Sequence, residues 1–213
     1  MFLPVTLELL GGFWESLKVF VLTLVFSLPL GLIISFGSMS KFRPLRLLVR
    51  TFVWIIRGTP LMLQLIIIFY GPGLMFGMKA MPRFTATIAA FAINYACYFS
   101  EIYRGGIESI PKGQYEAASV LGYNKSQTFF KIIFPQMVKR VLPPVTNEVI
   151  TLVKDTSLAF VLTYEEMFTV AKQIAAAQTT IMPLFVAGVF YFVFNAVVAF
   201  AMERIEKKLS YYR

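Results

Sequence analysis

The sequence predicts an all-α polytopic membrane protein, and three observations carry this prediction. The 213 residues are 58% hydrophobic and only 15% charged, which is more apolar than a soluble domain. Long stretches carry no charge, and the basic residues gather between them. A bilayer core about 30 Å thick needs roughly 20 apolar residues of helix, so this length accommodates about five spans in a single domain over residues 1–213.

Uncharged segments define the first three spans. No residue between Lys18 and Lys41 is charged, which predicts a span over about 17–40. The next uncharged stretch opens with GTPLMLQLIIIFYGPG and predicts a second span over about 52–77. The segment FTATIAAFAINYACYFS predicts a shorter third span over about 84–104.

The last two predicted spans differ in whether they contain charged residues. MPLFVAGVFYFVFNAVVAFAM is uncharged and predicts the final span over about 180–203. The segment over about 141–166 is long and apolar enough to cross, but it contains Glu148, Lys154 and Asp155. Hydropathy alone leaves this fourth span open.

The distribution of basic residues supports the fourth span and sets the orientation, because Lys and Arg concentrate in cytoplasmic loops. With five spans and the N-terminus outside, fifteen basic residues lie inside and four outside. The outer four are Lys18, Lys79, Arg83 and Lys172. We therefore expect a multi-pass protein of the cytoplasmic or inner membrane with its C-terminus inside.

Composition excludes several kinds of chemistry. The chain has no histidine and one cysteine, so we expect no disulfide framework, no Cys/His metal site and no bound cofactor. Cys97 lies in an apolar run and is interpreted as a small buried hydrophobe. The net charge of +9 does not indicate nucleic-acid binding, because the basic residues sit between apolar segments instead of forming an arm. There is no GxxxxGK[ST] phosphate-binding loop, so the chain carries no sequence signature for cradling ATP itself.

The inner segment over about 105–140 has its own order. EAASVLGYNKSQTFFKIIF places apolar residues near helical spacing, with Gly113 before it and Pro135 after it. This pattern predicts a short amphipathic helix flanked by two breakers.

A spaced set of residues in this segment makes it specific. The set is Glu116, Ala117 and Ala118, then Gly122, then Ile132, Phe134 and Pro135. It resembles the EAA motif of ABC-importer permeases, EAA-x3-G-x9-I-x-L-P, with Phe in place of the usual Leu. The alternative is a solvated helix that contains Glu-Ala-Ala by chance.

Further stretches resemble the polar-amino-acid branch of that family and extend the resemblance over about residues 50–165. They are Arg57, Gly58, Thr59 and Pro60 with Gln64, then Glu101-Ile102-Tyr103-Arg104-Gly105-Gly106, then Lys154-Asp155-Thr156-Ser157-Leu158.

The resemblance implies a type I ABC-importer permease with a cytoplasmic coupling helix. It implies a dimer with an identical or homologous permease, ATPase subunits that bind ATP and Mg²⁺, and a solute-binding protein outside. The permease itself would be non-catalytic, and the substrate would be a polar amino acid.

Polar side chains within the third and fourth spans are the candidate substrate-binding residues. Charges inside a span cost roughly 2.5 to 3.5 kcal/mol each and persist by pairing or by lining a wet cavity. The candidates are Asn94, Tyr98, Glu101, Thr151, Lys154, Asp155, Thr156 and Ser157. The alternative is structural: Asn94 and Tyr98 bond between helices, Lys154 pairs with a nearby carboxylate, and Glu101 pairs with Arg57 or Arg104.

Two further groups have expected roles. Ala117, Ala118 and Gly122 form a small-residue surface for an ATPase groove with Glu116 at its rim, although Gly122 could instead only end a helix. The set Arg57, Gly58, Thr59, Pro60 and Gln64 is assigned to a gate or to structure.

Other functions remain open at this stage. They are a membrane scaffold without a pathway, a permease for another small polar solute, and an intramembrane enzyme, which the missing histidine disfavours.

Overall fold

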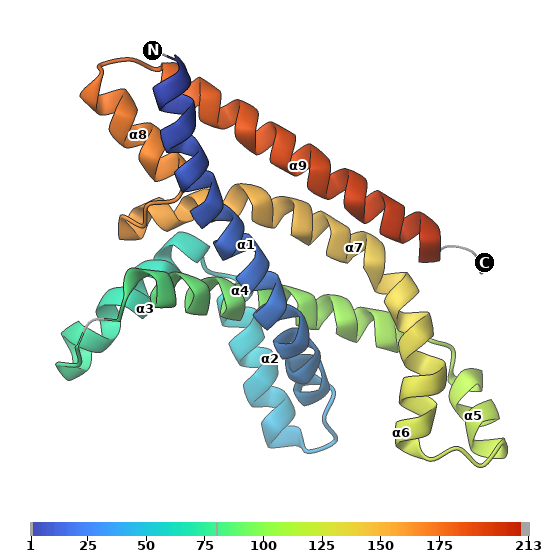
Figure 1. The fold of residues 1–213 in the computed structure, drawn as a ribbon. Coiled ribbons are helices and arrows are strands. Elements are labelled where there is room, and N and C mark those ends of the chain that lie inside the picture. Colours follow the sequence, from blue (N-terminus) through green and yellow to red (C-terminus); the bar gives the residue numbers. More distant parts are fainter. Residues whose placement is uncertain (1, 80, 210–213) are drawn as a thin grey trace.

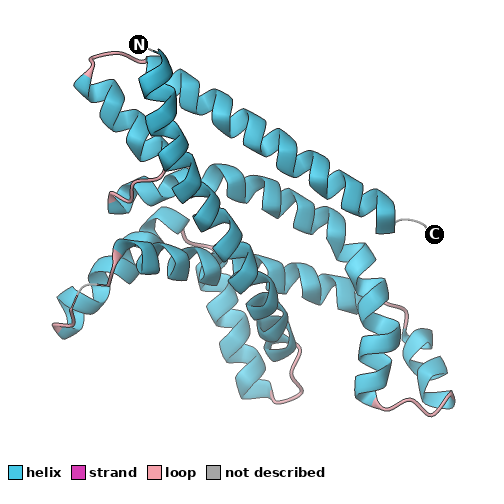
Figure 2. Ribbon diagram, viewed as in Figure 1, coloured by secondary structure: helices cyan, strands magenta, loops and turns pink. Residues whose placement is uncertain are grey.

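The computed structural model describes residues 2–79 and 81–209, and these residues form helices with no strand among them (Figures 1 and 2). The helices are α1 (Phe2–Ser38), α2 (Arg43–Arg57), α3 (Leu61–Phe76), α4 (Arg83–Glu108), α5 (Lys112–Val120), α6 (Lys125–Thr128), a π-helix η1 (Phe129–Ile133), α7 (Phe134–Asp155), a 3₁₀ helix η2 (Thr156–Leu162), α8 (Met167–Ala177) and α9 (Met182–Leu209). The all-α prediction is confirmed.

The central packing is that of α1 on α4, the most extensive helix contact of the fold (Figure 1). The fully buried polar positions of α1 are all small, which lets the two backbones approach closely. They are Ser16, Thr23, Ser27, Ser35 and Ser38. At Gly31 an added Cβ would lie 2.9 Å from Phe99 Cβ and 3.0 Å from the carbonyl oxygen of Ala96. Helix α1 begins at Phe2, well before the predicted 17–40, so the helix is longer than the uncharged stretch.

The predicted span over 52–77 is not one straight helix. Helices α2 and α3 meet at a bend of 108° over Gly58, Thr59 and Pro60. Pro60 lies in extended backbone as the N-cap of α3, since a proline cannot continue the preceding helix. The sequence analysis treated 52–77 as one span and did not predict this bend.

The predicted fourth span over 141–166 is also divided. Helix α7 ends at Asp155, the chain continues as 3₁₀ helix to Leu162, and Thr163 takes a left-handed conformation with φ 52°. The chain then enters α8, a helix that the sequence analysis did not predict and that packs on α1 and α9 (Figure 1).

The predicted single amphipathic helix of the inner segment is a helical hairpin instead. Helix α5 ends before Gly122, and α6, η1 and α7 then follow without a break (Figure 1). Gly113 lies inside α5, and Pro135 lies within the continuous helix, directly after the π-helical turn η1. Neither residue acts as the predicted breaker.

Among the described residues, two helices are long and apolar enough to cross a membrane, α1 over Val5–Ser38 and α9, and the bent pair α2–α3 raises this to three. Helices α4 and α7 do not pass on composition, because they carry polar and charged residues such as Asn94, Glu101 and Glu148. A helix that turns such groups toward the bundle interior can still span. The count of five spans stays a prediction.

Candidate functional site

The hairpin α5–α6 presents the EAA-like residues, and its turn explains one of them. The N–H of Tyr123 donates to the carbonyl of Ala118 at 3.0 Å, and the N–H of Gly122 donates to that of Ser119 at 3.0 Å. This pair of bonds is the Schellman ending, and Gly122 occupies its left-handed position with φ 76°. The left-handed backbone fits the helix-terminator role considered for Gly122. An added Cβ there would meet no atom of this chain within 4 Å, and the coupling role stays a prediction.

The small-residue surface expected on this hairpin is divided between its two faces. Ala118 is fully buried within the subunit, while Glu116 and Ala117 are exposed. The most exposed apolar side chains near the turn are Val120, 88% exposed, and Leu121, 71% exposed. Sequence reasoning missed both, although apolar residues beside a glycine turn are a signal for a contact surface.

The base of the hairpin is tied to α7 and to the end of α4. The Gln136 amide donates to the Gln114 side chain at 3.2 Å, and the Arg140 guanidinium donates to the hydroxyl of Ser109 at 2.9 Å. On α5 itself, partial burial raises the pKa of the Tyr115 phenol, which is protonated at neutral pH. The hairpin and α7 are therefore mechanically connected.

The bend between α2 and α3 is held by two buried amides. Gln64 donates to the carbonyl of Ile56 at 2.8 Å and to the Thr59 hydroxyl at 2.9 Å, and Asn94 donates to the Gln64 carbonyl oxygen at 3.0 Å. Backbone groups freed by a helix break need such partners inside a membrane protein. The structure therefore assigns Asn94, 5% exposed, to the interhelical bonding considered as its alternative role.

The carboxylate of Asp155 at the end of α7 is paired across the bundle. The Tyr95 phenol on α4 donates to it at 2.7 Å. Glu148 lies seven residues earlier on α7, which places it on the same helical face as Asp155. The sequence analysis proposed neither Tyr95 nor Glu148 as a site residue. The spacing of seven residues between Glu148 and Asp155 could have indicated Glu148, because it places both carboxylates on one helical face.

Lys154 points elsewhere. It is exposed and lies on one stripe of α7 with Asn147 and Thr151, which are also exposed. No carboxylate within the described residues makes an ion pair with Lys154 at 4.0 Å or less. A polar stripe on a membrane helix avoids lipid, so this face belongs to a wet cavity or to a partner subunit.

The remaining hydroxyl candidates of this region are bonded locally. Thr156 is fully buried and donates to the carbonyl of Val153 at 2.8 Å, so it faces away from any pathway. Ser157 is half-buried and donates to the carbonyl of Lys154 at 2.7 Å. Thr151 donates to the carbonyl of Asn147 at 2.9 Å and keeps its oxygen exposed.

Glu101 has both of the predicted partners. Arg104 holds it through two hydrogen bonds of 3.1 and 2.7 Å, whereas the nearest Arg57 nitrogen lies 3.9 Å away. The Arg57 guanidinium stands over the Tyr98 ring at 5.0 Å. Arg57, Tyr98 and Glu101 are thus brought together, through the Glu101 pairing that was considered as the structural alternative.

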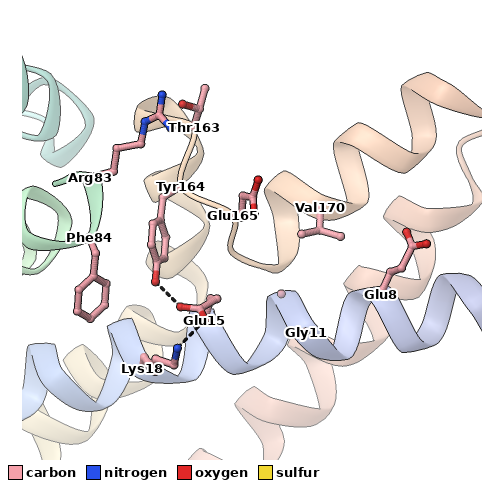
Figure 3. A pocket seen from close by; sticks show the side chains of 11 residues that line it. Glu8, Gly11, Glu15, Lys18, Arg83, Phe84, Thr163, Tyr164, Glu165 and Val170 are labelled. Carbon is pink, nitrogen blue, oxygen red and sulfur yellow. Dashed lines mark hydrogen bonds and ion pairs between the residues drawn. The ribbon is translucent and has the colours of Figure 1, made fainter.

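A cleft of about 790 Å³ opens at the other end of the molecule from the hairpin (Figures 1 and 3). In Figure 3, Tyr164 and Lys18 both point to Glu15, whose carboxylate accepts from the Tyr164 phenol and from Lys18 at 2.6 Å. Glu8 and Arg83 lie toward opposite ends of the view. The cleft is elongated and carries both signs of charge.

A buried carboxylate closes the inner side of this region. Glu166 is fully buried and caps α8, accepting from the N–H groups of Phe168 and Thr169 at 2.7 Å each. It also accepts from the Tyr191 phenol at 2.9 Å and from Ser16 at 3.4 Å. Glu166 therefore links α1, α8 and α9. The only sequence signal for its capping role is its position directly before a helix.

Residues 27–211 match the family described as the binding-protein-dependent transport system inner membrane component. The chain belongs to this family. Among its relatives, the L-cystine transport system permease protein of Bacillus subtilis strain 168 is 37% identical over 205 residues, which are 95% of this chain and 86% of that protein. The arginine transport system permease protein of the same organism is 35% identical over 203 residues, 95% of this chain and 92% of that protein.

Solved structures agree with this membership. The crystal structure of an amino acid ABC transporter with histidines matches this permease with a TM-score of 0.88 and 31% identity, covering 97% of this chain and 96% of that one. The inward-facing MetNI methionine ABC transporter matches with a TM-score of 0.80 at 19% identity, which shows the fold alone. The type I ABC-importer permease fold expected from the sequence is confirmed.

Proposed function

We propose that this chain is the membrane-spanning subunit of an ATP-driven importer of polar amino acids. The observation that carries the proposal is the group of charged and hydroxyl side chains on the facing parts of α2, α4 and α7, with an exposed polar stripe on α7 beside it. Lipid contact would be costly for these groups, so each must be paired within the protein or face a water-filled path, and the exposed α7 stripe beside them supports the path. The relatives that transport cystine and arginine support an amino acid as the solute.

The chemistry of a free amino acid fits this group. Its ammonium needs an anionic acceptor, which Asp155 or Glu148 offers, and its carboxylate needs a donor, which Lys154 offers. The exposed hydroxyl of Thr151 adds a neutral contact. Because Lys154 lies on the outward stripe of α7, a second permease facing that stripe would complete the site.

The partners follow from the two ends of the molecule. The exposed hairpin α5–α6, with Glu116, Ala117, Val120 and Leu121, is the surface we assign to an ATPase subunit, which would bind ATP and Mg²⁺. The cleft beside Glu15, at the opposite end, is assigned to a solute-binding protein. The permease chain would take no catalytic part.

This arrangement commits to an orientation, with the hairpin in the cytoplasm, the N-terminus outside and the C-terminus inside. In a Cys97→Ser background, a membrane-impermeant thiol reagent added to intact cells should label Lys172→Cys and spare Lys112→Cys. The reverse pattern would invert the proposed topology.

The transport role is tested with purified complexes in liposomes. Asp155→Asn and Ser157→Ala should lower amino-acid uptake while leaving ATPase association and basal ATP hydrolysis largely intact. Glu203→Gln, on the exposed side of α9, is the matched control and should transport normally.

The outcome separates transport from scaffolding. Equal loss of assembly and uptake in Asp155→Asn would assign the carboxylate to structure alone. Unchanged uptake in both variants would remove these residues from the pathway.

A further inference from the structure

A second, smaller cleft lies between α2 and α4 and is rich in guanidinium groups. Its volume is about 210 Å³, and its lining is Arg50, Val53, Trp54 and Arg57 from α2 with Glu101 and Arg104 from α4. The α2 residues recur at spacings of three, one and three, which places them on one helical face. Three cations therefore face a single carboxylate within the cleft.

The carboxylate does not neutralise all three cations. Glu101 is held by Arg104 through bonds of 3.1 and 2.7 Å, and Arg104 also reaches Glu108 at 2.7 Å. Arg57 stays 3.9 Å from Glu101. Arg50 makes no ion pair at 4.0 Å or less with a described carboxylate; its Nε donates to the carbonyl of Ser38 at 3.0 Å. The two terminal nitrogens of Arg50 and the guanidinium of Arg57 can therefore still donate hydrogen bonds to an oxyanion.

The helix that supplies these cations also exposes a large apolar surface. Val53 is the single buried residue of α2, while Leu47, Leu48 and Trp54 are 70%, 67% and 77% exposed. An arginine-rich face beside Leu and Trp side chains is the composition of helices that bind at the membrane interface. Trp54 borders the cleft itself and suits the headgroup level of a bilayer.

We propose that the α2–α4 cleft binds the phosphate of an anionic phospholipid from the cytoplasmic leaflet, with the acyl chains along the apolar side chains of α2. Guanidinium forks match phosphate oxygens, and basic pockets between helices on the cytoplasmic side suit such headgroups. A free phosphate could bind the same guanidinium groups, but it has no acyl chain to contact Leu47 and Leu48. The leaflet rests on the orientation proposed above; the site itself does not depend on transport.

The test uses the purified transporter complex in nanodiscs of phosphatidylcholine with or without phosphatidylglycerol. Lipid that remains bound after detergent extraction is counted by native mass spectrometry. Arg50→Gln should reduce retained phosphatidylglycerol about tenfold, as expected for the loss of a charge-assisted donor. Arg43→Gln removes the same charge from the same helix outside the cleft and should retain lipid as the wild type does.

A second variant guards against misfolding. Trp54 is mostly exposed, so Trp54→Ala should assemble normally and still lose phosphatidylglycerol. Equal losses in Arg43→Gln and Arg50→Gln would overturn the site in favour of diffuse surface attraction. Displacement of the lipid by inorganic phosphate, with equal thermal stabilisation by phosphate alone, would overturn the lipid as ligand. Lipid retention needs no ATP, so its failure is distinct from a failure of uptake.

Discussion

The Tyr95 phenol on α4 donates a 2.7 Å hydrogen bond to the Asp155 carboxylate, 60 residues further along the chain. This bond joins α4, the helix packed on α1, to the end of α7, the helix that continues from the hairpin α5–α6. A displacement of α7 would therefore be transmitted to α4, in the centre of the bundle, through this hydrogen bond.

Removing the phenol tests this connection. Tyr95→Phe deletes one hydrogen bond to a charged group, and we expect roughly a tenfold loss of initial uptake rate with the complex still assembled. In combination with Asp155→Asn the losses should not multiply, because both variants break the same contact. Fully multiplicative losses in liposome uptake would show that the two side chains act separately.

The amide pair at the helix bend carries a stability prediction. Gln64→Leu leaves the buried Asn94 amide without its acceptor, which should cost about 1–3 kcal/mol. The cost is measured as a fall in thermal unfolding temperature in detergent. Gln173→Leu, on the exposed side of α8, should change it little. Equal shifts for the two variants would argue against a structural amide pair.

Close packing of α1 on α4 predicts a contrast between two glycines of one helix. Gly31→Ala forces a methyl group against Phe99 and Ala96 and should destabilise by about 1–3 kcal/mol. Gly11→Ala meets open space and should be neutral or stabilising by up to about 1 kcal/mol. Thermal unfolding of both variants decides the matter, and a tolerated Gly31→Ala would mean that the helices can separate.

The hairpin turn separates the two explanations of Gly122. Asparagine tolerates left-handed backbone and valine does not, so Gly122→Asn should keep ATPase binding and coupled uptake while Gly122→Val loses both. Co-purification of the ATPase with each variant is the measurement. If Asn is as damaging as Val, the glycine is needed for close approach to the partner and not for the turn.

Much of the fold could be predicted from local pattern, and the exceptions have physical causes. Helix α9 follows from one long uncharged stretch, and its range is close to the predicted 180–203. Helix α1 extends past Glu15 and Lys18 because Glu and Lys are good helix formers, so the end of an uncharged stretch does not mark the end of a helix. The division of 141–166 depends on packing of α8 against α1 and α9, which no local period reveals.

The candidate site was predictable in composition and less so in geometry. The pairing of Glu101 with Arg57 or Arg104 could be predicted because a carboxylate within a span needs a cation, whereas the position of the Arg57 guanidinium over the Tyr98 ring could not. It could not distinguish Asn94, whose acceptor is Gln64 at 30 positions' distance, from a side chain that faces a pathway. Cys97 is buried and free, in agreement with its interpretation as a hydrophobe.

The most direct test of the central claim is ATP-dependent uptake. This permease, reconstituted in liposomes with its ATPase and solute-binding protein, is supplied with labelled glutamine, arginine and cystine outside and ATP inside. The account predicts that at least one of these accumulates against its gradient, only with ATP, and more slowly in Asp155→Asn. An assembled complex that hydrolyses ATP in response to its binding protein but accumulates no polar amino acid would contradict it.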